Sequence, residues 1–105
     1  MRSLFLFSAT LLMAACDPAQ VADKVGRRAA DSVVQPVMAG YMSGPQADIA
    51  TRCIVDNASA DQVQALAQDV GVGAGPRTLA NVRAAAANPA AMACMAAAGI
   101  PPIGG

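Results

Sequence analysis

Proline and glycine residues divide this chain into short segments, and their spacing restricts the fold more than any other sequence feature. Ser43-Gly44-Pro45 and Asn88-Pro89 are stop-and-restart signals, because proline lacks an amide donor and suits the first position of a helix. No stretch alternates apolar and polar residues with β-branched enrichment, and alanine, the best helix former, is the commonest residue. The sequence therefore predicts an all-α fold, a small bundle of about four to five short helices.

The first predicted helix runs from about Pro18 to Gln35. Pro36 should break or kink it, because proline clashes with the preceding turn, and a short continuation would reach Met42. Asp23 faces Arg27 one turn later, which adds local support. The core face is expected at steps of four residues and consists of Val21, Val25, Ala29 and Val33.

The second predicted helix runs from Pro45 to about Asn57, and the third follows Ser59. Ser59 is the expected N-cap and Gln62 completes a capping box, so the sequon-like Asn57-Ala58-Ser59 is interpreted as a helix end followed by a cap. Gly71 should end the third helix, and residues 71–75 form a glycine-rich connector without the strand that a nucleotide-binding loop requires. The expected core residues are Ile49, Ala50, Cys53 and Ile54 in the second helix and Val63, Leu66, Ala67 and Val70 in the third.

The fourth predicted helix starts at Pro76, and the fifth runs from Pro89, with Asn88 as its cap, to Ala98, where Gly99 stops it. Residues 101–105 cannot continue the last helix and form a tail. In the fourth helix Leu79, Val82 and Ala86 should face inward, and Arg77 and Arg83 outward.

The N-terminal segment has the features of an export signal. Arg2 precedes an uncharged run from Leu4 to Ala14, which is too short to span a bilayer but has the length of a signal peptide. The stretch Leu12-Met13-Ala14-Ala15-Cys16 resembles the lipobox of bacterial lipoprotein precursors. This resemblance implies that residues 1–15 are removed and that lipidated Cys16 becomes the first residue. An ordinary secretory signal, an uncleaved anchor and a misassigned start are the alternatives.

Cys53 and Cys94 are the two cysteines that remain once Cys16 is assigned to lipid. An even pair in an exported chain is interpreted as a disulfide. Such a bridge would supply stability that the small apolar core alone cannot provide. The alternatives are a redox or metal pair, which would want a C-x-x-C motif or nearby histidine, and free buried thiols.

Removal of residues 1–15 would leave 90 residues with Tyr41 as the single aromatic side chain. Six basic residues then face seven aspartates, a balance that argues against a nucleic-acid partner. The expected organisation is a signal peptide at 1–15, a lipidated N-terminus and kinked helix at 16–44, a disulfide-linked helical domain at 45–100, and a tail at 101–105.

The chain contains no histidine and no glutamate, and its aspartates are dispersed singly, so we identify no catalytic residue and expect no enzyme. No cofactor-binding or metal-binding residues are assigned either. Met92 and Met95 could form a soft-metal site, but filling of gaps in an alanine-rich core is the favoured interpretation.

The expected function is a lipid-anchored interaction or structural module that faces the periplasm, with the membrane and an envelope protein as partners. The alternatives are a secreted membrane-active peptide resembling a bacteriocin or holin, which the uncharged run 84–105 motivates, and an accessory subunit of an envelope enzyme.

Overall fold

The computed structural model describes residues 18–71 and 75–101, and within these ranges every regular element is an α-helix. This confirms the predicted all-α bundle. The five helices are α2 (Pro18–Ala39), α3 (Gly44–Asp56), α4 (Ala60–Ala67), α5 (Pro76–Ala86) and α6 (Pro89–Ala97). Proline stands in the first turn of α3, α5 and α6, as the stop-and-restart signals predict.

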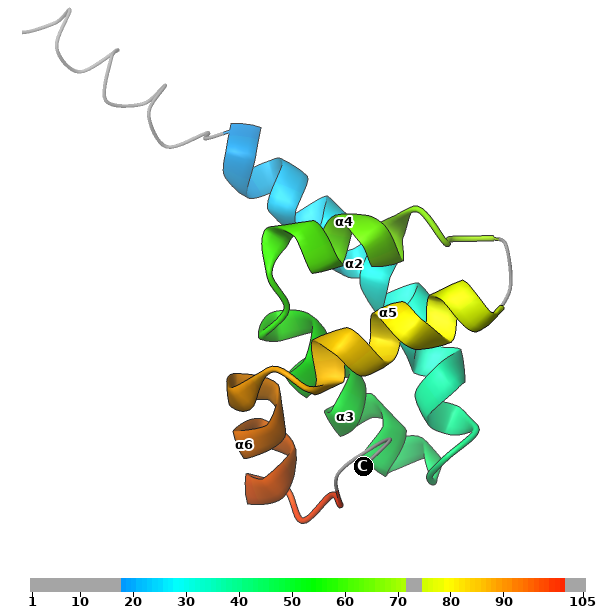
Figure 1. The fold of residues 1–105 in the computed structure, drawn as a ribbon. Helices are drawn as coiled ribbons and strands as arrows, with labels where there is room; N and C mark the ends of the chain where they lie inside the picture. Colours follow the sequence, from blue (N-terminus) through cyan, green and yellow to red (C-terminus); the bar gives the residue numbers. More distant parts are fainter. Residues whose placement is uncertain (1–17, 72–74, 102–105) are drawn as a thin grey trace, which may run out of the picture.

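The long helix α2 is the element around which the others are arranged. It packs most extensively against α3 and α4, while α6 packs mainly against α3. Figure 1 shows that α4 runs along one side of the bundle and that α5 returns in the opposite direction toward α6. This return brings α6 back to α3, as a bridge between Cys53 and Cys94 requires.

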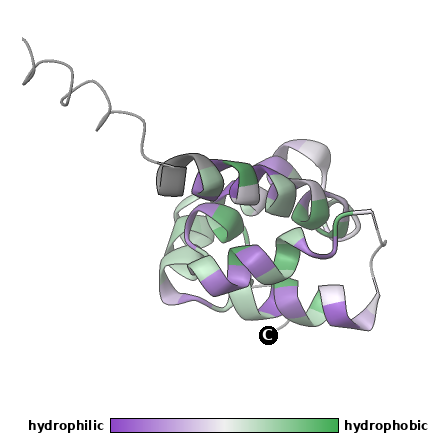
Figure 2. Cartoon of the chain, turned by 90° about the horizontal axis from the view of Figure 1, so that it is seen from above, coloured by the Kyte–Doolittle hydropathy of each residue, from purple (hydrophilic) through white to green (hydrophobic). Residues whose placement is uncertain are grey.

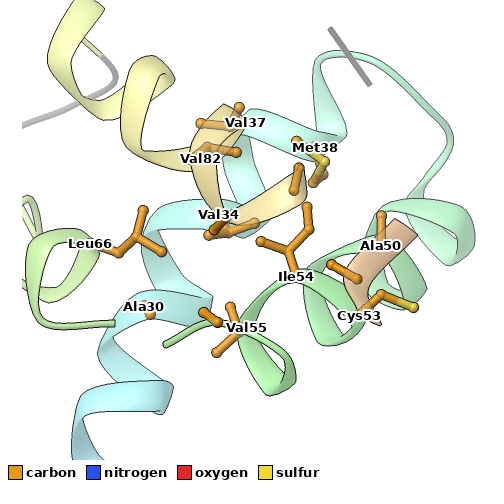
Figure 3. Packing of buried hydrophobic residues seen from close by; sticks show 14 of the residues in the cluster. Ala30, Val34, Val37, Met38, Ala50, Cys53, Ile54, Val55, Leu66 and Val82 are labelled. Carbon is orange, nitrogen blue, oxygen red and sulfur yellow. The ribbon is translucent and has the colours of Figure 1, made fainter. Parts of the chain in front are cut away.

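One apolar core joins the helices. Val34 and Ile54, both fully buried, lie at its centre between α2 and α3 (Figure 3). Leu66 from α4 and Val82 from α5 are also buried and extend the same core toward these two helices. Residues from both the predicted 16–44 and 45–100 segments therefore contribute to a single core.

The core face of α2 differs from the expected one. Val33 is buried as predicted, but Val25 is 63% exposed, whereas Ala30, Val34 and Met38 are fully buried. The expected stripe lies one residue out of phase with the buried one: Gly26, next to Val25, faces Val63 of α4, while Val25 itself points away from the other helices. The side chain of Val21 lies outside the described residues.

Pro36 does not end the helix: the predicted break at Gln35 is wrong, while the predicted continuation past Pro36 is present but ends at Ala39 rather than Met42. Helix α2 continues to Ala39, with the exposed Pro36 inside it and Val37 and Met38 buried just after it. Burial of these two side chains stabilises the last turn by more than the loss of one amide donor disfavours it. Local propensity is here overridden by packing.

Two apolar residues expected in the core are instead on the surface. Ile49 of α3 is 42% exposed, while Ala50, Cys53 and Ile54 are buried as predicted. Val70 is 49% exposed because α4 ends at Ala67, one turn earlier than the periodicity indicates. The apolar face of α3 is instead completed by alanines, Thr51 and Val55. Figure 2 shows the resulting mixture of hydrophilic and hydrophobic residues along the helices.

Gly99 ends the last helical segment as expected, whereas the predicted end of the third helix at Gly71 is wrong, because α4 stops at Ala67 and Gly71 lies in the turn after it. Gly71 (φ 81°) and Gly99 (φ 76°) are the described residues with positive φ, a conformation that side chains disfavour. After α6, the amide of Gly99 donates to Ala96 O (3.0 Å) and that of Ile100 donates to Met95 O (2.9 Å). These two bonds form a Schellman motif, and the buried Ile100 packs the turn after α6 against the bundle.

Candidate functional site

The cysteine pair links two helices that are far apart in sequence and pack against each other. Cys53 of α3 and Cys94 of α6 are joined with Sγ atoms 2.04 Å and Cα atoms 5.5 Å apart, which confirms the predicted pairing. Cys53 is buried, while Cys94 is partly accessible. Since α6 buries only Ala91 and Met95 from its own turns, the crosslink is a main determinant of its position.

The predicted capping box at Ser59 and Gln62 is present. The Ser59 hydroxyl accepts a bond from the amide of Gln62 (3.2 Å), and the Gln62 side chain accepts one from the amide of Ser59 (2.9 Å). Both amides would otherwise lack a helical partner. The interpretation of Asn57 as a helix end is also confirmed, since it is the C-cap residue of α3 and donates to Cys53 O (2.8 Å).

Asn88 has a different role from the expected cap, because its side chain makes no capping bond to α6. It forms a reciprocal amide pair with Gln62, donating to Gln62 Oε1 (2.6 Å) and accepting from Gln62 Nε2 (3.3 Å). It also donates to Asn57 O (3.2 Å). The competing tertiary partners take the side chain away from its local cap, and they tie the start of α6 to the start of α4.

Arg27 makes a tertiary contact, at the end of α3, that the sequence pattern did not predict. Its predicted pairing with Asp23 is confirmed at 3.0 Å. The same guanidinium donates to Val55 O and to Ala58 O, the latter at 3.4 Å. A cation at these carbonyls satisfies and complements the negative end of α3. Nothing in the spacing of Arg27 and residues 55–58 along the chain signals this contact.

A cleft of about 280 Å³ lies between α2 and α3, and three of its lining residues are charged. Its lining residues are Asp31, Gln35, Asp48, Thr51 and Arg52. Burial raises the pKa of the Asp31 carboxyl above its usual value, the charge of Asp56 raises it further, and Arg52 opposes both effects. Gln35 Nε2 donates to Asp48 Oδ1 (2.5 Å), so the second carboxylate already has a protein partner.

A second cleft, of about 230 Å³, lies between α2, the end of the α4 segment and α5. Both clefts fall below the roughly 300–1,000 Å³ that small-molecule sites occupy. The Thr51 hydroxyl of the first cleft donates to Ala47 O (2.7 Å), and the Ser32 hydroxyl of the second donates to Ala29 O (2.7 Å). The lining residues of the second cleft are Ser32, Val33, Pro36, Asp69, Val70, Gly71 and Thr78.

The two methionines of α6 are not brought together. Met95 is 2% exposed and fills the core, as the gap-filling interpretation predicts, whereas Met92 is 46% exposed. Among residues 18–71 and 75–101, no group of three or more His, Cys, Asp or Glu side chains is close enough to hold a metal ion. In the same part of the chain no helix is both long and apolar enough to cross a bilayer.

The lipidation candidate Cys16 lies outside the described residues, as do the predicted signal peptide and residues 102–105 of the predicted tail. The chain has no matching protein-family model, curated protein or solved structure.

Proposed function

We propose that this protein is a lipid-anchored exported module whose helical domain contacts other envelope components and performs no catalysis. The observation that carries the proposal is the stretch from Leu12 to Cys16, which stands at the end of an uncharged segment of signal-peptide length. Several acyl chains on one cysteine would anchor the domain stably, because each buried methylene contributes about 0.8 kcal/mol.

The helical domain supports this proposal through its size and its crosslink. The Cys53–Cys94 bridge is of the kind found in oxidising compartments outside the cytosol. Arg27 is bonded to helix-end carbonyls and Asp48 to Gln35, which favours a structural role for these two charged side chains. The protein would therefore act through the surface that it presents at the membrane.

The start of α2 lies so close to Cys16 in sequence that a lipid on Cys16 would hold the helical domain near the membrane. Only Asp17 separates Cys16 from Pro18, where α2 begins. Two residue steps can span at most about 7 Å. A lipid on Cys16 would therefore hold the first turn of α2 next to the bilayer and limit how far the domain can move from it.

The proposal is tested by expressing the full chain and its Cys16→Ser variant in a bacterium that processes lipoproteins, with labelled palmitate in the medium. The wild type should incorporate the label, partition into detergent and begin at an acylated Cys16 by mass spectrometry. The Cys53→Ser/Cys94→Ser variant is the matched control, because it loses two cysteines and should keep the label. Wild-type protein in the aqueous phase with an unmodified N-terminus would refute the proposal.

A further inference from the structure

The first turns of α2 expose two cations and one valine along a single side of the helix. Val25 is 63% exposed, the highest value among the large apolar residues that the structure describes, and Lys24 and Arg28 are exposed beside it. Lys24 and Arg28 are one turn apart on the same face, and Val25 lies about 60° from Arg28 round the helix. We call these three residues the α2 outer stripe.

The neighbouring residues fix the direction in which the stripe points. Gly26 packs against α4, because a Cβ atom at this position would lie 3.3 Å from Val63 Cγ1. Steps of four residues from Gly26 lead to Ala30 and Val34, which are fully buried. The two cations of the stripe each stand two residues from Gly26, so they lie about 160° away from it round the helix. The stripe is therefore on the side of α2 opposite to the core.

We propose that the α2 outer stripe contacts the headgroup layer of the membrane, with Lys24 and Arg28 at the phosphates of anionic phospholipids and Val25 at the boundary with the acyl chains. The inference rests on the proposed lipid on Cys16 and adds an orientation of the domain to it. Figure 2 shows α2 along one edge of the bundle, so this contact lays α2 on the bilayer and keeps the other helices clear of the lipid.

The short distance to the proposed anchor favours lipid as the occupant of the stripe. Helix α2 begins at Pro18, two residue steps and at most about 7 Å from Cys16. Arg28 lies a further rise of about 15 Å along the helix. The Cα atoms of the stripe therefore stay within about 22 Å of the acylated cysteine, whatever path the two linking steps take. A protein partner would have to enter the narrow space between the stripe and the bilayer.

The charge of the stripe also complements anionic lipid. Among the described residues the ion pair is that of Arg27 with Asp23, and neither cation of the stripe is paired with a described acid. Long basic side chains place their charge at the phosphates while their methylenes cover apolar surface. Each such residue near an anionic bilayer strengthens binding about fivefold.

The small size of the stripe is compatible with this partner. A protein interface needs about 800 Å² on each side to be stable, which three side chains cannot supply. An acylated domain is already held at the membrane by its lipid, so the stripe has only to select one orientation. Val25 contributes to that selection as an apolar residue of the kind that enters the headgroup boundary.

The test uses the acylated protein, purified from the bacterium that processes it, on vesicles of phosphatidylcholine with or without added phosphatidylglycerol. Lys24 is the single lysine, so its rate of acetylation, followed by mass spectrometry, reports whether the stripe is covered. The quantity compared is the rate on neutral vesicles divided by the rate on anionic vesicles, in which direct effects of a substitution on Lys24 cancel. Arg28→Gln removes one charge from the stripe, and Arg77→Gln removes one from the exposed start of α5 as the matched control. Circular dichroism verifies that both variants fold.

We expect a wild-type ratio on the order of ten, which falls toward unity as salt is raised. Arg28→Gln should lower the ratio about fivefold, whereas Arg77→Gln should leave it unchanged. A wild-type ratio of unity, or equal ratios for the two variants, would overturn the headgroup contact. A ratio that rises with protein density at fixed lipid composition would identify a neighbouring copy as the occupant and also overturn it.

Mass spectrometry of Cys16 separates this inference from the proposed function. An unlipidated Cys16 contradicts both, whereas lipidated protein with a Lys24 ratio of unity contradicts the α2 outer stripe alone.

Discussion

Removal of the Cys53–Cys94 crosslink should destabilise the fold strongly. The bridge closes a loop with a sequence separation of 41 residues. Loop-closure entropy for that length contributes about 4 kcal/mol to the free energy of unfolding at 25 °C. A domain of this size shifts its Tm by about 4–8 °C per kcal/mol, so reduction should lower Tm by about 15–30 °C.

The structure also predicts which helix loses stability first after reduction of the disulfide. Helix α6 is held to α3 by the bridge and by Ala91, Met95 and the following Ile100, and alanine contributes little apolar area. After reduction, the amides of α6 should exchange with deuterium faster than those of α2. This difference would separate local release of α6 from uniform weakening of the bundle.

The assay is thermal unfolding followed by far-ultraviolet circular dichroism, with and without a phosphine reductant. The Cys53→Ser/Cys94→Ser variant is the control: its Tm should match that of the reduced wild type and should not respond to the reductant. A fall in Tm of less than about 5 °C on full reduction, with free thiols verified by alkylation, would refute the loop-closure reasoning.

Three further outcomes are expected. Ser59→Ala should lower the free energy of unfolding in urea by about 0.5–2 kcal/mol, because it leaves the Gln62 amide without its cap; a neutral result would contradict the capping role. Leu66→Ala should cost about 2–5 kcal/mol in the same assay, since Leu66 is fully buried, while Val70→Ala should cost much less; equal losses would contradict the assigned burial. For Asp31 the folded pKa lies above the ordinary 3.8, so its favourable contribution is fully present below pH 3.8 and is lost as pH rises through the folded pKa. Asp31→Asn should therefore raise Tm at pH 7 relative to the wild type, with a gain that shrinks toward pH 3; a constant gain at all pH values would contradict this sign.

The helix order could be predicted from sequence because its signals are local. Proline in the first turn, a serine followed three residues later by glutamine, and glycine after a helix each act within a few residues. The cysteine pairing was accessible for a different reason: with Cys16 assigned to lipid, only Cys53 and Cys94 remain to be joined.

Which side of each helix faces the core was predicted less accurately than the helix order, because the many alanines make the apolar pattern ambiguous. In α2 the alanines allow several stripes, and the one chosen ran through Val25 instead of Ala30 and Val34. The error at Pro36 has a related cause, since only the position of α3 and its neighbours reveals that Val37 and Met38 have a core to enter. Neither fact is encoded in the neighbouring residues.

The contacts that hold α6 show how a chain with few bulky side chains specifies one arrangement. At its start, Asn88 pairs with Gln62 and donates to Asn57 O. The first turn of α6 is therefore joined to the C-terminal end of α3 and to the first turn of α4. In its middle, Cys94 is bonded to Cys53, and at its end the buried Ile100 completes a Schellman motif. These contacts depend on geometry rather than on apolar area, so they fix the position of α6 while consuming little of its surface. An apolar helix can then remain exposed on one side without losing its place in the bundle.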